Sequence, residues 1–77
     1  MKVTIVGRSG CKWCREARKL CKERKIKYKY ENLEAEANRE LAHWFAIENI
    51  KTVPQIWVDG RQIGGYQELK AFLEEDS

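Results

Sequence analysis

Residues 3–14 read VTIVGRSGCKWC, a stretch in which a predicted strand gives way to a predicted helix. The first four positions are rich in β-branched side chains, which favour a strand. Residues 7–10 carry two glycines and a serine, so we expect a loop whose Ser9 caps the helix that follows. That helix should run from Lys12 to about Arg24, because apolar side chains recur there at helical spacing. The positions expected to face inward are Trp13, Ala17, Leu20 and Cys21.

Further segments along the chain read as strands, because their apolar side chains alternate with period two or are rich in β-branched and aromatic residues. Asp59-Gly60 is a strong hairpin-turn sequence, so the two strands that it joins should pair in antiparallel fashion. These predicted strands cover residues 26–31, 55–59 and 61–63.

Two more helices are predicted, one over residues 35–48 and one after the glycine pair Gly64-Gly65. The resulting order, β-α-β-α-β-β-α, predicts an α/β fold with a four-stranded mixed sheet flanked by three helices. Its first β-α-β passage should place two strands in parallel with a right-handed crossover. The apolar positions expected to face inward are Ala37, Leu41, Trp44 and Phe45 in the second helix and Tyr66, Leu69, Phe72 and Leu73 in the third.

Length and composition limit the class of protein. A chain of 77 residues has room for one core, so we expect a single domain over residues 1–77. With 35% charged and 43% hydrophobic residues, the composition is that of a globular protein rather than a disordered one. No apolar run is long enough for a membrane span, and the N-terminus has no secretory apolar region, so we expect a cytoplasmic protein with no membrane partner.

Charge is divided unevenly along the chain. Residues 1–29 hold eleven basic and two acidic side chains, whereas residues 30–77 hold four basic and ten acidic ones. The basic part contains all three cysteines, so a thiolate formed there lies in a positive field. The excess of cations is consistent with a solvated helix face, with attraction of an anionic small molecule, with an acidic partner or with nucleic acid. Since no nucleic-acid-binding motif accompanies it, we expect no nucleic-acid partner.

Cys11 and Cys14 are separated by three positions at the start of the first predicted helix. Side chains three apart on a helix have Cβ atoms about 5–6 Å apart, whereas a disulfide prefers about 3.5–4.5 Å. Closing the bridge therefore needs local adjustment, and strained bridges are easily reduced, which favours a redox role over a structural one.

The two cysteines should differ in reactivity. Cys11 lies at the start of the helix, where unpaired N–H groups and the macrodipole favour an anion, and Arg8, Lys12 and Arg15 add positive charge. We therefore expect the pKa of the Cys11 thiol to be lowered, which makes Cys11 the attacking thiol and a good leaving group. Cys14 lies one turn further inside and should be the less exposed, resolving thiol.

A zinc site is the alternative use of these cysteines, since Cys11, Cys14, Cys21 and His43 form a Cys₃His set on paper. Cys21 is seven residues beyond Cys14, about 10 Å along a helix axis, which is too far to share a tetrahedral metal. We therefore expect no metal site. Cys21 reads as a small core residue and His43 as a surface residue.

The chain resembles a small glutaredoxin of the compact bacterial or phage type over essentially its whole length. The resemblance rests on the Cys-Lys-Trp-Cys motif after the first strand, on residues 52–60 (TVPQIWVDG) and on residues 63–69 (IGGYQEL). It implies a thioredoxin fold, a cis peptide bond before Pro54 facing the cysteine pair, and glutathione-dependent thiol–disulfide exchange. Glutathione would be the reductant, and no cofactor would be tightly bound.

By the same resemblance, a set of residues would bind glutathione or the substrate. Arg8 matches the basic residue before the motif, and Thr52 and Val53 match the backbone clamp on the cysteinyl part. The motif interior departs from the family's commonest Pro-Tyr, and Gln67 stands where many members carry an acidic or hydroxyl side chain. The whole set is Arg8, Lys12, Trp13, Thr52, Val53, Pro54, Gly65, Tyr66 and Gln67.

The function expected from these observations is reduction of protein disulfides and glutathione mixed disulfides by a monomeric dithiol glutaredoxin. One alternative is a glutaredoxin-like redoxin that is reduced by thioredoxin reductase and donates electrons to ribonucleotide reductase. A second alternative is a module that binds an iron–sulfur cluster between two subunits through Cys11 and glutathione, and a third is a nucleic-acid-binding module.

Overall fold

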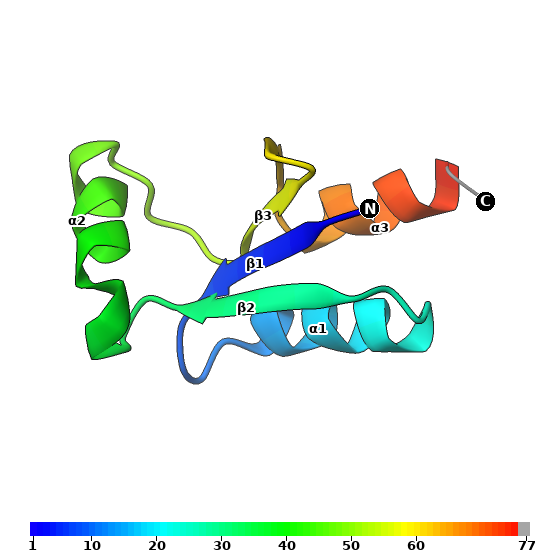
Figure 1. The fold of residues 1–77 in the computed structure, drawn as a ribbon, viewed down its shortest axis with the longest axis horizontal. Helices are drawn as coiled ribbons and strands as arrows, with labels where there is room; N and C mark the ends of the chain where they lie inside the picture. The colour runs from blue at the N-terminus through cyan, green and yellow to red at the C-terminus, as the bar shows by residue number, and fades with distance from the viewer. Residues whose placement is uncertain (76–77) are drawn as a thin grey trace.

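The computed structural model describes residues 1–75 as three helices packed around one mixed sheet of four strands (Figure 1). The strands are β1 (Val3–Gly7), β2 (Tyr28–Asn32), β3 (Gln55–Val58) and β4 (Arg61–Gly64). The helices are α1 (Lys12–Glu23), α2 (Arg39–Ile47) and α3 (Tyr66–Glu75), and a short 3₁₀ turn, η1 (Glu36–Asn38), precedes α2. The predicted element order and fold class are confirmed. None of the helices within residues 1–75 is long and apolar enough to span a membrane.

The strands are ordered β2-β1-β3-β4 across the sheet. β1 pairs in parallel with β2 and in antiparallel fashion with β3, so that Ile5 lies between Tyr30 and Ile56. The hairpin predicted at Asp59-Gly60 joins β3 to β4, and both turn residues have positive φ (51° and 83°), as a type I′ turn requires.

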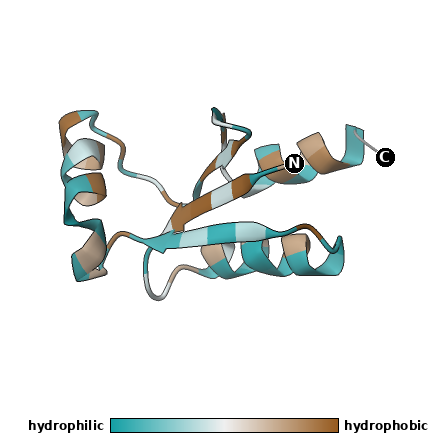
Figure 2. Cartoon of the chain, viewed as in Figure 1, coloured by the Kyte–Doolittle hydropathy of each residue, from teal (hydrophilic) through white to brown (hydrophobic). Residues whose placement is uncertain are grey.

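Side chains from the strands alternate between two faces of the sheet, and each face has its own hydrophobic cluster. On one face α1 and α3 cover the central strands, and the residues buried there are Val3, Ile5, Ala17, Cys21, Ile56, Val58, Leu69 and Leu73. Hydropathy colouring shows β1 as the most apolar strand, flanked by the more polar β2 (Figure 2). Burying each large side chain contributes about 1.5–3 kcal/mol, so this first cluster is the main source of stability.

The second cluster lies on the opposite face, where Val6, Leu33 and Phe45 are buried. The prediction of one helix over residues 35–48 was wrong in its first turn, because Asn38 is not helical (φ −106°, ψ 24°) and η1 ends there. Ala37 and Trp44, which were expected to face inward, are exposed. α2 lies at one end of the sheet (Figure 1), and Phe45 is the residue of this helix that is buried.

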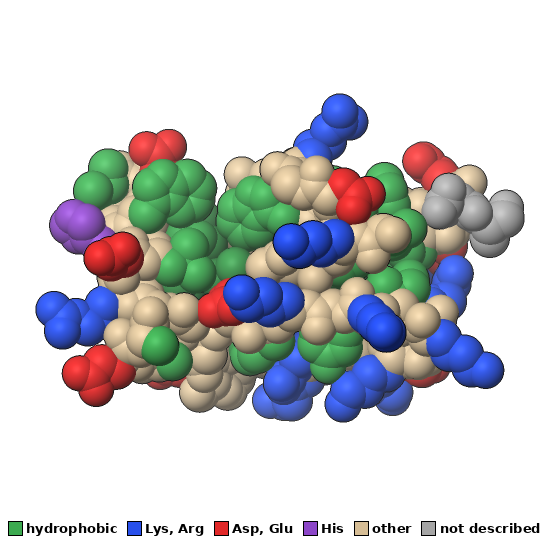
Figure 3. All heavy atoms as spheres, in the orientation of Figure 1, with side chains coloured by type: hydrophobic (Ala, Val, Ile, Leu, Met, Phe, Trp, Pro, Cys, Tyr) green, Lys and Arg blue, Asp and Glu red, His purple; other side chains and the backbone are tan. Residues whose placement is uncertain are grey.

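Cationic side chains gather over α1, which is seen along the lower edge of the space-filling view (Figure 3). The buried side of α1 consists of Cys14, Ala17 and Cys21, and its other positions are wholly or partly exposed. Trp13 was expected to face inward but is 49% exposed, because its side chain leaves the helix toward α3 rather than toward the sheet.

Candidate functional site

Cys11 occupies the N-cap position of α1, with extended backbone angles (φ −92°, ψ 111°). Its Sγ accepts a hydrogen bond from the backbone N–H of Cys14 at 3.1 Å. Ser, Thr, Asp or Asn usually fills this position, because a side-chain oxygen can satisfy an otherwise unpaired N–H of the first turn. Here the Cys11 sulfur does so, and the Cys14 N–H group that it caps therefore points at the atom that would carry the charge of a thiolate.

The prediction that Ser9 caps α1 was therefore wrong. Gly10 turns the chain between Ser9 and the helix with a positive φ of 74°, so Ser9 is held by β2 and the segment after it. Ser9 donates its backbone N–H to Glu34 Oε1 at 2.7 Å, and its Oγ accepts from Asn32 Nδ2 at 3.2 Å. The Ser9 hydrogen bond lowers the pKa of the Glu34 carboxyl, with a smaller contribution from the charge of Arg8.

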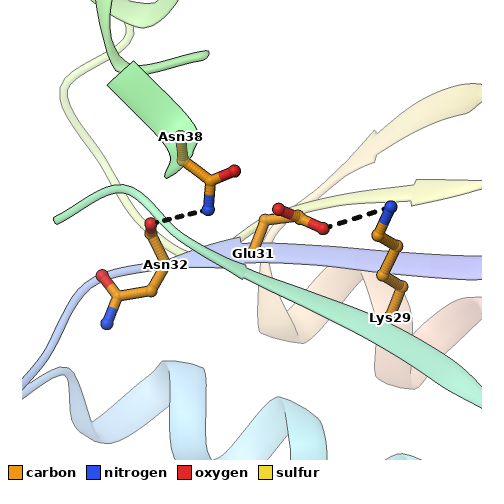
Figure 4. Close-up of polar contacts among 4 residues, drawn as sticks. All are labelled: Lys29, Glu31, Asn32 and Asn38. Carbon is orange, nitrogen blue, oxygen red and sulfur yellow. Dashed lines mark hydrogen bonds and ion pairs between the residues drawn. The ribbon is translucent and has the colours of Figure 1, made fainter. Parts of the chain in front are cut away.

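Asn32 also connects this loop to η1. Its backbone oxygen accepts a hydrogen bond from Asn38 Nδ2 at 2.9 Å (Figure 4). Its side-chain oxygen accepts from the backbone N–H of Glu34 at 2.8 Å. The loop before Cys11 is thus fixed by a small polar network rather than by hydrophobic packing.

Cys11 and Cys14 are joined as a disulfide, with their Cα atoms 5.2 Å apart. Cys11 is partly exposed, whereas Cys14 is 1% exposed, as its place one turn further into the helix predicts. Gly7 lies directly against Cys14, since a Cβ atom built on Gly7 would be 2.6 Å from Cys14 Sγ. The end of β1 therefore needs a glycine at this position to leave room for the second cysteine.

Val53 and Pro54 approach the cysteine pair from the start of β3. The peptide bond between them is cis, as predicted, and Pro54 is buried. The backbone oxygen of Val53 lies 3.8 Å from Cys11 Sγ. A group bound to the Cys11 sulfur would therefore lie beside the backbone of Val53, a partly exposed residue.

A groove of about 400 Å³ opens beside this contact. It is formed by the first turn of α1, the segment leading into β3, and the junction between β4 and α3. The structure brings together seven of the residues predicted for the binding site, although they come from three distant segments. They are Trp13, Thr52, Val53, Pro54, Gly65, Tyr66 and Gln67, and Gln55, Gly64 and Glu68 complete the lining.

Glu68 is a residue of this groove that the sequence interpretation missed. Its Oε1 accepts a hydrogen bond from the backbone N–H of Gly65 at 2.7 Å, so its carboxylate lies at the start of α3. This is half of a capping box, in which the third helical residue reaches back to the N-cap. The spacing of a capping box was present in the sequence, but the N-cap is a glycine rather than Ser or Thr.

Arg8 and Lys12 flank Cys11 in the chain but do not line the groove. Both are exposed, and Lys12 Nζ lies 5.3 Å from the centre of the Trp13 ring. The Trp13 ring in turn lies 5.2 Å from that of Tyr66, with the planes inclined by 38°. The two rings form one wall of the groove, and the Lys12 ammonium lies next to it.

The third cysteine is separate from this site. Cys21 is fully buried in the first hydrophobic cluster, as predicted, and burial raises the pKa of its thiol. His43, the fourth member of the hypothetical zinc set, is an exposed residue of α2. Within residues 1–75, no three His, Cys, Asp or Glu side chains are grouped so that they could hold a metal ion.

Comparison with known proteins agrees with this geometry. The glutaredoxin family model matches residues 3–63, and glutaredoxin 1 of Escherichia coli is 39% identical over 99% of this chain and 96% of its own length. The chain belongs to the glutaredoxin family. The crystal structure of glutaredoxin 1 from Francisella tularensis, complexed with cacodylate, is similar with a TM-score of 0.77 at 32% identity, covering 97% of this chain and 94% of that one.

A buckwheat glutaredoxin in complex with glutathione shares the fold, with a TM-score of 0.77 at 20% identity over 96% of this chain and 69% of that one. The fold is therefore that of thioredoxin and the glutaredoxins. Family membership together with the Cys11–Cys14 pair makes this glutaredoxin a thiol–disulfide oxidoreductase.

Proposed function

We propose that this protein is a cytoplasmic dithiol glutaredoxin that reduces protein disulfides and glutathione mixed disulfides and is re-reduced by glutathione. The observation that carries the proposal is the asymmetry of the cysteine pair. Cys11 Sγ is partly exposed, accepts a backbone N–H and lies beside an open groove, whereas Cys14 is buried behind it. The first sulfur can meet a substrate, and the second can meet only the first.

In the reduced protein, the Cys11 thiolate attacks one sulfur of the substrate disulfide. A bond forms between Cys11 and that sulfur, and the other substrate sulfur leaves as a thiolate, which takes up a proton. The Cys14 thiol then loses its proton, and the resulting thiolate attacks Cys11 Sγ, which breaks the bond to the substrate sulfur, releases the second substrate thiolate and closes the Cys11–Cys14 disulfide. Two electrons have passed to the substrate, and two glutathione molecules restore the dithiol by becoming glutathione disulfide.

The groove supports glutathione as the reductant, because its parts match the parts of that tripeptide. The Val53 backbone can pair with the extended cysteinyl portion next to Cys11, as in recognition by strand addition. The backbone N–H groups of Tyr66 and Gln67, at the start of α3, can donate hydrogen bonds to a carboxylate of glutathione. The N–H group of Gly65 already donates to the side chain of Glu68. Arg8 and Lys12 add positive charge for an anionic ligand, and Trp13, Thr52, Pro54 and Gly65 complete its contact surface.

The electron source is tested by NADPH oxidation with an uncharged small disulfide as substrate. We expect turnover with glutathione and glutathione reductase, and none with thioredoxin reductase alone. Turnover sustained only by thioredoxin reductase would contradict the proposal and would favour the redoxin class of electron donor. A Cys11→Ser variant is the control for reduction by glutathione itself without the protein.

A further inference from the structure

Four cations form a continuous stripe along the exposed side of α1. They are Lys12, Arg15, Lys19 and Lys22, and they are called here the cationic stripe. Their spacing of three, four and three residues places them on one helix face. The stripe begins at the residue after Cys11 and extends about 15 Å from it, at 1.5 Å per residue.

Of the four cations, only Lys22 lies in the last turn of α1, where a positive charge complements the helix dipole. Like charges three or four residues apart on a helix repel one another and destabilise it. The first turn of α1 contains no acidic side chain, so Lys12 and Arg15 also face the positive end of the helix dipole without compensation. A cluster that weakens its own helix points to a partner outside the protein.

Within residues 1–75 the stripe takes part in no ion pair, and Lys12 is its one member that lies over an aromatic ring, that of Trp13. Lys29 and Glu31 of β2 form an ion pair at 3.3 Å (Figure 4). In the part of the chain that the structure describes, neither acid of α1, Glu16 or Glu23, pairs with the stripe in this way. The positive charges of the stripe are therefore free to act on a ligand.

The two sides of Cys11 differ in charge. Along α1, Arg18 stacks on the Tyr30 ring at 4.3 Å and extends the positive surface toward β2. Lys and Arg atoms crowd this edge of the molecule (Figure 3). On the other side, the groove is lined by uncharged residues and the Glu68 carboxylate. A bound glutathione would occupy the groove and come close only to Lys12 of the stripe, so that Arg15, Lys19 and Lys22 stay exposed.

We propose that the cationic stripe is a docking surface for acidic segments of protein substrates, next to the disulfide that Cys11 attacks. The inference rests on the proposed function and adds the substrate class. A carboxylate-rich segment within about 15 Å of the substrate disulfide lies along the stripe while the disulfide meets Cys11. The positive field also steers such substrates to the reactive sulfur before contact. A protein segment fits better than nucleic acid, because only the protein brings a disulfide to the site.

The test uses two synthetic peptides that differ only in charge. Each contains one intramolecular disulfide followed by three Glu or three Lys residues, and kcat/KM is measured with glutathione and glutathione reductase. In about 0.01 M salt we expect the acidic peptide to be reduced about tenfold faster than the basic one. In about 1 M salt, where charges more than about 3 Å apart are screened, this preference should disappear.

Two double variants assign the preference to the stripe. Lys19→Glu with Lys22→Glu should abolish or invert the preference for the acidic peptide. Arg39→Glu with Arg61→Glu makes the same change in net charge at exposed positions of α2 and β4, and should keep the preference. Both double variants leave Cys11 and its neighbours in the chain unchanged, so we expect them to leave its chemistry unchanged. The effect on docking is therefore measured by the ratio of kcat/KM for the two peptides.

Equal rates for the two peptides at low salt would overturn the proposal, as would an equal loss of preference in both double variants. Binding of a short DNA duplex at about 0.15 M salt, lost only in the Lys19/Lys22 variant, would assign the stripe to nucleic acid and would also overturn it. Failure of the proposed function is distinguishable, because the wild-type protein would then reduce neither peptide nor the uncharged small disulfide with glutathione.

Discussion

The backbone N–H of Cys14 donates a hydrogen bond to Cys11 Sγ at 3.1 Å, so the sulfur that we propose as the nucleophile of this glutaredoxin also caps its helix. Replacing Cys11 with serine keeps a good N-cap but removes the nucleophile. We expect Cys11→Ser to fold with a free energy of unfolding within about 1 kcal/mol of the wild type while losing all thiol–disulfide exchange. Urea unfolding and the NADPH-coupled assay measure the two effects separately.

Cys14→Ser should separate two reactions. The variant should still reduce glutathione mixed disulfides, because that reaction needs only Cys11, but should no longer release protein substrates by the two-thiol route. Cys21→Ala removes the third cysteine from the core and should keep both activities. An inactive Cys14→Ser variant beside an active Cys11→Ser variant would reverse the assigned roles.

Gly7 should tolerate no side chain, because a Cβ atom there would lie 2.6 Å from Cys14 Sγ and 2.8 Å from Tyr30 Oη. We expect Gly7→Ala to lower the free energy of unfolding by about 1–3 kcal/mol, the usual effect of overpacking. The control is Gly10→Asn, because Asn tolerates a positive φ and its Cβ would meet nothing within 4 Å. If both variants lost the same free energy of unfolding, the cause would be the backbone conformation of this segment rather than a contact between a Gly7 side chain and Cys14.

The second hydrophobic cluster can be tested within one helix. Phe45 is 2% exposed and Ile47 is 64% exposed, although both lie in α2. We expect Phe45→Ala to lower the free energy of unfolding by about 3–5 kcal/mol and Ile47→Ala to change it by at most about 0.5 kcal/mol. If Phe45→Ala does not fold, Phe45→Leu should fold with a smaller loss. Equal effects at the two positions would contradict the packing of α2 described above.

Glu34 should make the stability of the protein depend on pH. The Ser9 hydrogen bond lowers the pKa of this carboxyl in the folded state, so its contribution to stability is present above its ordinary pKa and is lost as the pH falls through the lowered value. The difference in unfolding free energy between the wild type and Glu34→Gln should therefore shrink between about pH 6 and about pH 2. Because a hydrogen bond is the main cause, the effect should persist in about 1 M salt; its loss there would identify the charge of Arg8 as the cause instead.

The sequence predicted the order of elements well, because each strand and helix carries its own local signal. The Asp59-Gly60 turn and the period of α1 needed no knowledge of distant residues. The errors occurred where a tertiary contact decides local structure. Ser9 has a side chain that is suitable for a helix N-cap, but it forms hydrogen bonds with Glu34 and Asn32 instead of capping α1.

The prediction of the site was likewise incomplete where tertiary contacts decide the structure. Most lining residues of the groove were predicted from the resemblance to glutaredoxins, and the structure brings them together from three segments. Glu68 was missed because its role depends on where α3 begins, which the sequence defines only to within a few residues. Trp44 was predicted to be in the core because its spacing from other apolar residues is helical. It is exposed in the structure, where α2 lies at one end of the sheet.

Cys11 should be ionised near neutral pH, because the start of α1 and the nearby cations would stabilise its thiolate. Trypsin would place the three cysteines of the reduced protein on different fragments, SGCK, WCR and LCK, so that iodoacetamide alkylation can be followed at each one as a function of pH. We expect the alkylation of Cys11 to have its midpoint well below about pH 8.5, the value of free cysteine, and we expect little reaction at buried Cys21. A Cys11 thiol that titrates like free cysteine would contradict this expectation.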